Sequence, residues 1–325
     1  MRLTCIPRGA GARCCRALAL PLLTAACLGT LRGHLVAQAA AAGADTLRQP
    51  PIARNLSRRA GLVEVEITAA PARIPLLPGS LPANVYAYNG SIPGPTIEAH
   101  EGDSVVIHFR NRLPEPTTVH WHGVHLPANA DGSPLYPIQP GSDHAYAFRI
   151  AAGSAGTYWY HPHADATTTR QVALGLYGAI IVRPANDPLA GVPEKLLVLS
   201  DNRLNPDGSV AFPAPGSVQA SIDMENGREG DRLFVNGQIM PRIVVASGEV
   251  QRWRIVNASA ARVYRLALPD QRLLHVGDDG GLFERPVETP SLVLANSERV
   301  EVLVRGQAAG AHVALEDLPY DRYAP

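Results

Sequence analysis

Apolar and polar residues alternate over short stretches of the chain, with the period of two that a strand with one buried face requires. Such stretches begin at Val63, recur at 105–109 and 178–182, and end with a last clear strand at 300–304. Glycine and proline are frequent, at 29 residues each, and aromatic residues make up only 6%. The pattern and the turn residues together favour an all-β chain over a helical one.

One motif occurs twice, about one domain apart. Asn89-Gly90-Ser91-Ile92, followed by Pro95, Gly102 and Asn111, recurs as Asn236-Gly237-Gln238-Ile239, followed by Pro241, Gly248 and Asn257. Self-similarity at this period indicates a duplicated fold, here a β-sandwich of Greek-key type. We expect the first sandwich over 60–185 and the second over 193–325, joined by a proline-containing linker at 186–192.

The first 39 residues have the order of a secretory signal. Four arginines among the first 16 residues precede an apolar run at 17–31 and then small residues around Ala37-Gln38-Ala39. The run is too short, and its flanks are wrong, for a transmembrane helix. The segment Leu23-Thr24-Ala25-Ala26-Cys27 also fits a lipoprotein cleavage box, which would end the leader at 26 and leave Cys27 acylated. We expect export to the periplasm, free or lipid-anchored, with the small and polar residues 40–59 as a flexible tether.

Charge and cysteine usage narrow the function further. The formal net charge is +0 and the sequence pI is about 7.2, so electrostatics give no reason to expect nucleic acid as a partner. All four cysteines, Cys5, Cys14, Cys15 and Cys27, fall in the leader. The part of the chain that follows the leader can therefore form neither a disulfide nor a cysteine-ligated metal site.

Two His-x-His motifs carry the candidate chemistry. His-Trp-His-Gly occupies 120–123 and His-Pro-His occupies 161–163. Residues two apart in a strand point to one face, so each pair aims two imidazoles at one place, and neighbouring strands would bring four together. One such pair alone is commonly metal-free, but two pairs beside aromatic residues and turn glycines indicate a metal site. By residue type, imidazoles without thiolate or carboxylate suit copper or zinc. The candidate ligands are His120, His122, His161 and His163.

At these motifs the chain resembles the multicopper oxidases, the family of laccases, bilirubin oxidases and bacterial copper-efflux oxidases. The resemblance spans about Val63 to Arg305 and rests on TTVHWHGVHLPANADGSP, AGTYWYHPHADATTTRQVALGLYGAIIV and DDGGLFERPVETPSLVLANSERVEVLV. It implies tandem cupredoxin-like sandwiches. It also implies an oxidase that removes single electrons from a phenolic substrate or cuprous ion and reduces O2 to water.

The resemblance also implies roles for single residues. His120 matches the type 2 copper ligand, whereas His122, His161 and His163 match ligands of the type 3 copper pair. Asp131 matches an acidic residue that assists proton delivery to the cluster. A turn-capping aspartate before Gly132 explains the same residue equally well from sequence alone.

The chain departs from the family in one respect. Family members carry a third domain with a His-Cys-His run, whereas this sequence shows no cysteine after Cys27 and no His-x-His after His163. His275 and His312 remain, in contexts more typical of structural or surface residues. We therefore expect half of the trinuclear-cluster ligands, no type 1 copper site and a catalytically incomplete chain: a fragment, a truncated product or a two-domain relative. The alternative is a non-catalytic copper-binding or structural protein of the same fold. Retention of all four histidines disfavours the copper-free structural form, and the family-like segments DDGG and ERVEVLV, far from the ligands, disfavour a copper carrier.

Overall fold

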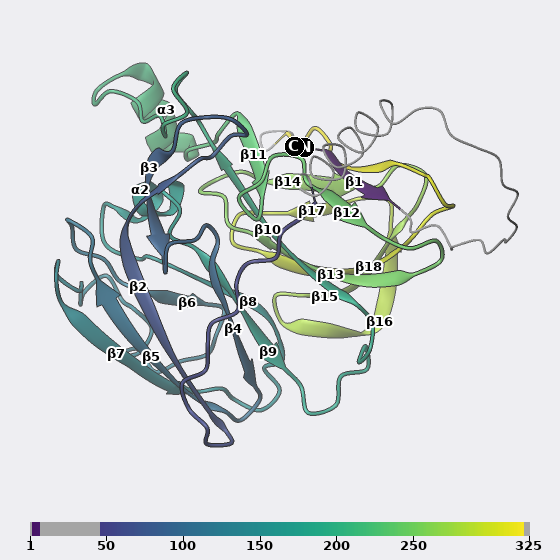
Figure 1. Cartoon of the computed structure of the whole chain (residues 1–325), viewed down its shortest axis with the longest axis horizontal. Coiled ribbons are helices and arrows are strands. Elements are labelled where there is room, and N and C mark those ends of the chain that lie inside the picture. The colour runs from purple at the N-terminus through teal and green to yellow at the C-terminus, as the bar shows by residue number, and fades with distance from the viewer. Residues whose placement is uncertain (1, 7–45, 322–325) are drawn as a thin grey trace, which may run out of the picture.

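The computed structural model describes residues 2–6 and 46–321 of the chain. In these residues the strands form four sheets, which lie in two halves side by side (Figure 1). The predicted class of tandem cupredoxin-like β-sandwiches is confirmed. No helix in this part of the chain has the length and apolar character needed to cross a membrane. The predicted leader lies outside the described residues except for strand β1 (Arg2–Ile6), which pairs with β12 and β19.

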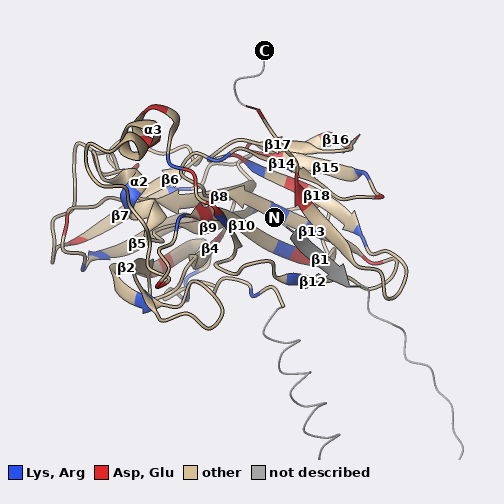
Figure 2. Ribbon diagram, turned by 90° about the horizontal axis from the view of Figure 1, so that it is seen from above, with Lys and Arg blue, Asp and Glu red and all other residues tan. Residues whose placement is uncertain are grey.

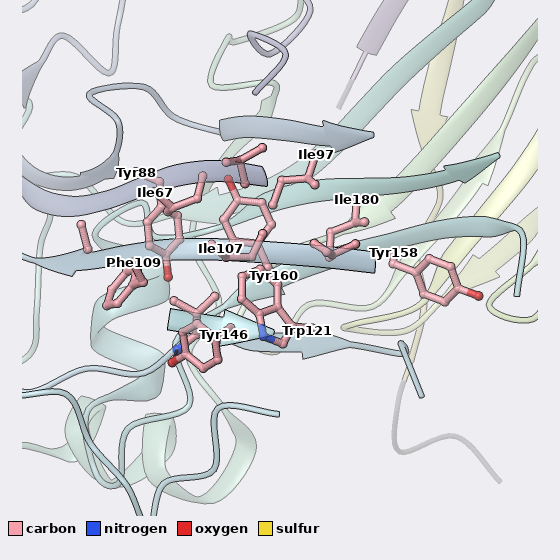
Figure 3. Close-up of a cluster of buried hydrophobic side chains, with 14 of the residues drawn as sticks. Ile67, Tyr88, Ile97, Ile107, Phe109, Trp121, Tyr146, Tyr158, Tyr160 and Ile180 are labelled. Atoms are coloured by element: carbon pink, nitrogen blue, oxygen red, sulfur yellow. Dashed lines mark hydrogen bonds between the residues drawn. The ribbon is translucent and has the colours of Figure 1, made fainter. Parts of the chain in front are cut away.

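The first half is a sandwich of two four-stranded sheets, in the orders β3-β2-β5-β7 and β4-β9-β8-β6. The first sheet contains β2 (Leu62–Ile74), β3 (Ala83–Tyr88), β5 (Ser104–Asn111) and β7 (Asp143–Arg149). The second contains β4 (Gly94–His100), β6 (His120–His122), β8 (Gly156–His161) and β9 (Gly178–Arg183), with the short helix α2 (Thr168–Ala173) between β8 and β9. Between the sheets, Trp121 packs against Tyr146 and Tyr160 in a buried core (Figure 3).

The second half has a six-stranded sheet, β11-β10-β13-β18-β15-β16, and a five-stranded sheet, β12-β1-β19-β14-β17. The six strands are β10 (Glu194–Asn202), β11 (Arg232–Val235), β13 (Val250–Asn257), β15 (Leu273–Asp278), β16 (Gly281–Thr289) and β18 (Arg299–Arg305). The remaining elements are β12 (Arg242–Val244), β14 (Tyr264–Ala267), β17 (Leu292–Leu294), β19 (Val313–Asp317) and helix α3 (Val218–Asn226). The expected last strand at 300–304 is thus followed by one more, β19.

The internal repeat has the same structure in both copies. Asn89 and Asn236 both adopt a φ of 50°, each before a glycine in the left-handed region. The side chain of Asn89 accepts from Thr68 N and donates to Glu66 O, and that of Asn236 accepts from Val198 N and donates to Leu196 O. Each asparagine therefore ties its turn to a neighbouring strand in the same way, as expected of a duplicated unit.

The two halves meet through one face of strand β8. At one end of this face, Thr157 donates to Glu301 Oε1 at 2.7 Å, and Arg254 Nη1 donates to Thr157 Oγ1 at 2.9 Å. Glu301 also binds Arg252 and lies on β18, so acidic and basic positions gather on the strands at this junction (Figure 2). Next along β8, Trp159 joins an apolar cluster that includes Val198 and Val256 of the second half.

The structure corrects the expectation that residues 40–59 form a flexible tether, as far as they are described. Arg48 N donates to Gln238 Oε1 in the second half, whereas Ala53 N donates to Thr96 O in the first. The described part of this segment is therefore hydrogen-bonded to both halves. Its partners are polar groups distant in sequence, which composition cannot reveal.

Candidate metal centre

Strands β6 and β8 bring the two His-x-His motifs together. The strands are antiparallel, with His120 opposite His161 and His122 opposite Trp159. The side chains of His120, His122 and His161 therefore share one face, while Trp121 points into the core with 0% of its surface exposed. This arrangement confirms the alternation predicted for the first motif.

Three imidazoles converge closely enough to bind a metal. Candidate ligand nitrogens of His120, His122 and His161 all lie within 4.8 Å of one another. His122 Nδ1 and His161 Nε2 are 3.3 Å apart, which matches the edge of a tetrahedral site with metal–nitrogen bonds of about 2.0–2.1 Å. Among the described residues, no other group of three histidine, cysteine or acidic side chains has this arrangement.

The fourth candidate, His163, lies beside this group but not in a strand. Strand β8 ends at His161, so the expectation that both histidines of the second motif lie in one strand is wrong. The backbone N of His163 donates to Thr118 Oγ1 at 2.8 Å, and its ring centroid is 5.4 Å from that of His120. The exposed ring therefore borders the group on the side of His120.

Backbone carbonyls fix which nitrogen of two imidazoles is free. His120 Nδ1 is 2.9 Å from Asp131 O, and His161 Nδ1 is 2.8 Å from Pro162 O. Because a carbonyl only accepts, each Nδ1 must carry the proton, which leaves Nε2 with its lone pair available for a metal. The outer hydrogen bonds of a metal-binding histidine serve this purpose.

Asp131 contacts His120 through its side chain as well as its backbone. Its Oδ1 lies 3.1 Å from His120 Nδ1, and 39% of the aspartate side chain is exposed. The residue after it, Gly132, has a φ of 71°, and a Cβ there would lie 1.9 Å from Val119 O. The absence of a side chain at Gly132 lets the loop approach the strand that carries His120.

The two more buried imidazoles are neutral at pH 7. Burial lowers the pKa of His122 to about 4, with the positive charge of Arg299 as the next cause. Burial also lowers the pKa of His161 to about 3. Both rings therefore offer neutral nitrogen lone pairs to a metal at physiological pH, as copper and zinc require.

Comparison with known proteins agrees with this site. Residues 73–187, which include all four histidines and Asp131, match a family model for multicopper oxidases. A multicopper oxidase of Staphylococcus aureus is 31% identical over 230 residues, covering 68% of this chain and 48% of the relative. A solved multicopper oxidase of Campylobacter jejuni, described as a metallo-oxidase, is 37% identical with a TM-score of 0.79, covering 86% of this chain and 57% of that one. This chain belongs to the multicopper oxidase family.

Another relative of this chain is named for a different role. Cell division protein FtsP of Shigella dysenteriae is 35% identical over 229 residues, covering 68% of this chain and 47% of that protein. The chain spans about half the length of these curated relatives. Membership of the family therefore does not by itself choose between an oxidase and a protein of another role.

Two residues outside the motifs also shape the candidate metal site. Arg299, on β18 of the second half, donates through Nε to Thr157 O at 3.0 Å, and its Nη2 would lie 2.4 Å from a Cβ at Gly123. Trp159 stacks on His161. Sequence reasoning missed the role of Arg299 because it lies 177 positions after His122 (299 minus 122).

The two histidines that follow the motifs, His275 and His312, lie away from the converging imidazoles. His275 Nε2 is 2.9 Å from Gly277 O, and its ring packs against Phe283 on β16. His312 is exposed near the end of the described residues. Neither belongs to the group of converging imidazoles, as the sequence predicted.

Proposed function

We propose that this chain supplies histidine ligands of the trinuclear copper cluster of a multicopper oxidase. His120 binds the type 2 copper, and His122, His161 and His163 bind the type 3 pair. The observation that carries this proposal is the convergence of three imidazoles, two of them held by backbone carbonyls so that Nε2 is unprotonated. Such outer hydrogen bonds are a common feature of metal-binding histidines.

The reaction we propose is the one-electron oxidation of a small reducing substrate, a phenol or cuprous ion, coupled to reduction of O2 to water. Copper supplies the change of valence that this chemistry needs. The protein holds the imidazoles neutral and oriented. Asp131, with a partly exposed carboxylate 3.1 Å from His120 Nδ1, is placed to pass protons between solvent and the cluster.

We infer that the remaining ligands come from a third cupredoxin-like domain of the kind found in the family. Residues 28–325 contain no cysteine, so a thiolate for a type 1 copper must be supplied from outside them. We propose that the leader directs export to the periplasm. Cleavage before Cys27 would leave that residue acylated and the protein anchored to a membrane.

The second candidate is a non-catalytic role in copper binding or cell structure, which the similarity to FtsP favours. A purely structural protein has no need of convergent imidazoles with free Nε2 atoms. Copper binding by the four histidines therefore separates the oxidase and copper-binding proposals from the structural one.

The test is a copper titration of the full chain and its variants. We expect the parent to take up Cu(II), and the double substitution His120→Ala and His163→Ala to remove most of this uptake, because His120 belongs to the converging group and His163 lies beside it. His275→Ala, outside the group, is the matched control and should bind copper like the parent. Equal uptake by the double variant and the control would contradict the proposed ligand set.

A further inference from the structure

The face of the sheet that carries the imidazoles also carries Trp159. On β8, Trp159 lies between Thr157, which bonds to the second half, and His161, a proposed copper ligand. The three share one face because they are two residues apart in a strand. Trp159 is therefore the residue at which contact with the second half gives way to the metal centre.

A single indole ring contacts two of the proposed ligands. The Trp159 ring is stacked on His161, with centroids 4.1 Å apart and an angle of 30° between the planes. The same ring lies 5.3 Å from His122 at 32°. Aromatic rings at these separations attract one another, and an offset stack fixes the tilt of each ring. Rotation of either imidazole away from the shared centre would break its contact with the indole.

Trp159 also packs against the second half. It belongs to a buried apolar cluster whose second-half members are Leu196, Val198, Val256 and Ala258. Only 3% of Trp159 is exposed, so the indole has little room to move while this cluster is closed. The position of the ring therefore depends on residues that contact no imidazole.

Packing alone does not explain why residue 159 is a tryptophan, because its indole N–H is left without a hydrogen-bond acceptor. Trp159 Nε1 is buried and has no hydrogen-bond partner among the described residues, although buried tryptophans usually satisfy this donor. Phenylalanine would fill an apolar cluster without leaving a donor unsatisfied. Tryptophan at this site thus costs stability, and its extended ring, which reaches two imidazoles, offers a compensating function.

We propose that Trp159 is a positioning residue that couples packing of the second half to the orientation of His122 and His161. The proposal rests on the proposed function, since it assumes that these imidazoles bind copper. It predicts that copper affinity depends on residues of the second half that never approach the metal.

The test compares Cu(II) affinity, measured by competition with a chromophoric chelator, in matched variants of the full chain. Removal of an outer partner of a metal ligand typically weakens metal binding about 10- to 100-fold. We expect Trp159→Leu to lose about 10-fold or more. Trp159→Phe keeps an aromatic face but has a smaller ring, so it should recover only part of that loss. Trp253→Leu removes a fully buried tryptophan from the core of the second half and should lower the melting temperature without weakening copper binding.

A second pair of variants tests the coupling without touching Trp159. Val256 and Val302 are both fully buried in the second half, but only Val256 belongs to the cluster that holds Trp159. We expect Val256→Ala to weaken copper binding several-fold and to alter the electron paramagnetic resonance spectrum of bound Cu(II). Val302→Ala should change neither.

The outcomes distinguish failure of the positioning role of Trp159 from failure of the proposed copper-binding function. Parent-like affinity in folded Trp159→Leu, equal losses in the Leu and Phe variants, or equal effects of the two valine substitutions would each overturn the positioning role while leaving the ligand set intact. If Trp159→Leu does not fold, the Phe variant and the valine pair decide. No copper binding by the parent chain would overturn the proposed function itself, and the positioning role with it.

Discussion

At the scale of single residues, the arrangement of the four candidate histidines depends on strands β6 and β8, on Thr118 and on two backbone carbonyls. Strand alternation correctly placed His120 and His122 on one face because the pleat enforces it. The same rule misplaced His163, since β8 ends at His161 and the backbone N of His163 donates to Thr118 Oγ1 outside any strand. The sequence also could not predict which nitrogen of His120 and His161 is unprotonated, because the backbone carbonyls of Asp131 and Pro162 determine it.

Gly132 tests whether the Asp131 loop holds His120. Alanine there must adopt a φ of 71° and would place its Cβ 1.9 Å from Val119 O, so the loop should move away from His120. We expect Gly132→Ala to weaken copper binding and to lower the free energy of unfolding by more than the ~1–2 kcal/mol of left-handed strain alone.

The control for this substitution is Gly141→Ala. Gly141 has a similar φ of 77°, but nothing lies within 4 Å of its added Cβ. Gly141→Ala should lower the free energy of unfolding only by the left-handed strain, with copper affinity unchanged. Urea denaturation and copper titration measure both effects, and equal results for the two variants would show that the close approach at Gly132 is irrelevant to the site.

At the scale of elements, the duplicated pattern gave the correct fold class because the same turn and strand contacts recur. The parallel pairs β2–β5 and β10–β13 occupy matching places, and Asn111 and Asn257 make matching bonds to carbonyls of their own halves. The short strand β19 escaped prediction, since only Leu315 of its five residues is fully buried. The contacts across the junction also escaped, because they join residues far apart in sequence.

The buried ionic group at the junction supports a prediction about stability. Glu301, with 0% of its side chain exposed, binds both Arg252 and Arg254, which are 3% and 1% exposed. Glu301→Gln would remove the more buried of the two carboxylates that these guanidinium groups share, and Glu194 would remain as their other shared partner. We expect a loss of about 3 kcal/mol in the free energy of unfolding, the lower end of the cost of breaking a buried ion pair.

An exposed ion pair provides the comparison for Glu301. Glu66 bonds to Arg110 at 3.0 Å with side chains 48% and 42% exposed. Glu66→Gln should cost under about 1 kcal/mol, because solvent screens such pairs. Chemical denaturation of both variants provides the measurement, and similar small losses would mean that the junction carboxylate is not needed for stability.

At the scale of the whole molecule, the second half contacts the candidate metal centre although it contributes none of the four histidines. Arg299 bonds to the strand that carries His161, and the cluster around Trp159 spans both halves. Sequence motifs point only to the first half, since ligands are recognised by type and spacing while supporting contacts depend on the tertiary fold. We therefore propose that the two halves act as one unit in copper binding.

Once the predicted leader is removed, the copper-loaded chain should lack the intense blue absorption of a type 1 centre. That colour arises from a copper–thiolate bond, and residues 28–325 contain no cysteine to form one. We also expect no turnover with phenolic dyes or cuprous ion by this chain alone. Visible absorption and oxygen-uptake measurements with added copper check both, and turnover without another polypeptide would contradict catalytic incompleteness.

The most direct test of the central claim is the location of copper in the protein. Crystals of the full chain loaded with copper would be measured by anomalous diffraction at the copper edge. The account predicts density within bonding distance of His122 Nδ1 and His161 Nε2, which lie 3.3 Å apart, and further density beside His120 and His163. Copper bound only at other histidines, such as His100, His108 or His275, with these four imidazoles free, would contradict it.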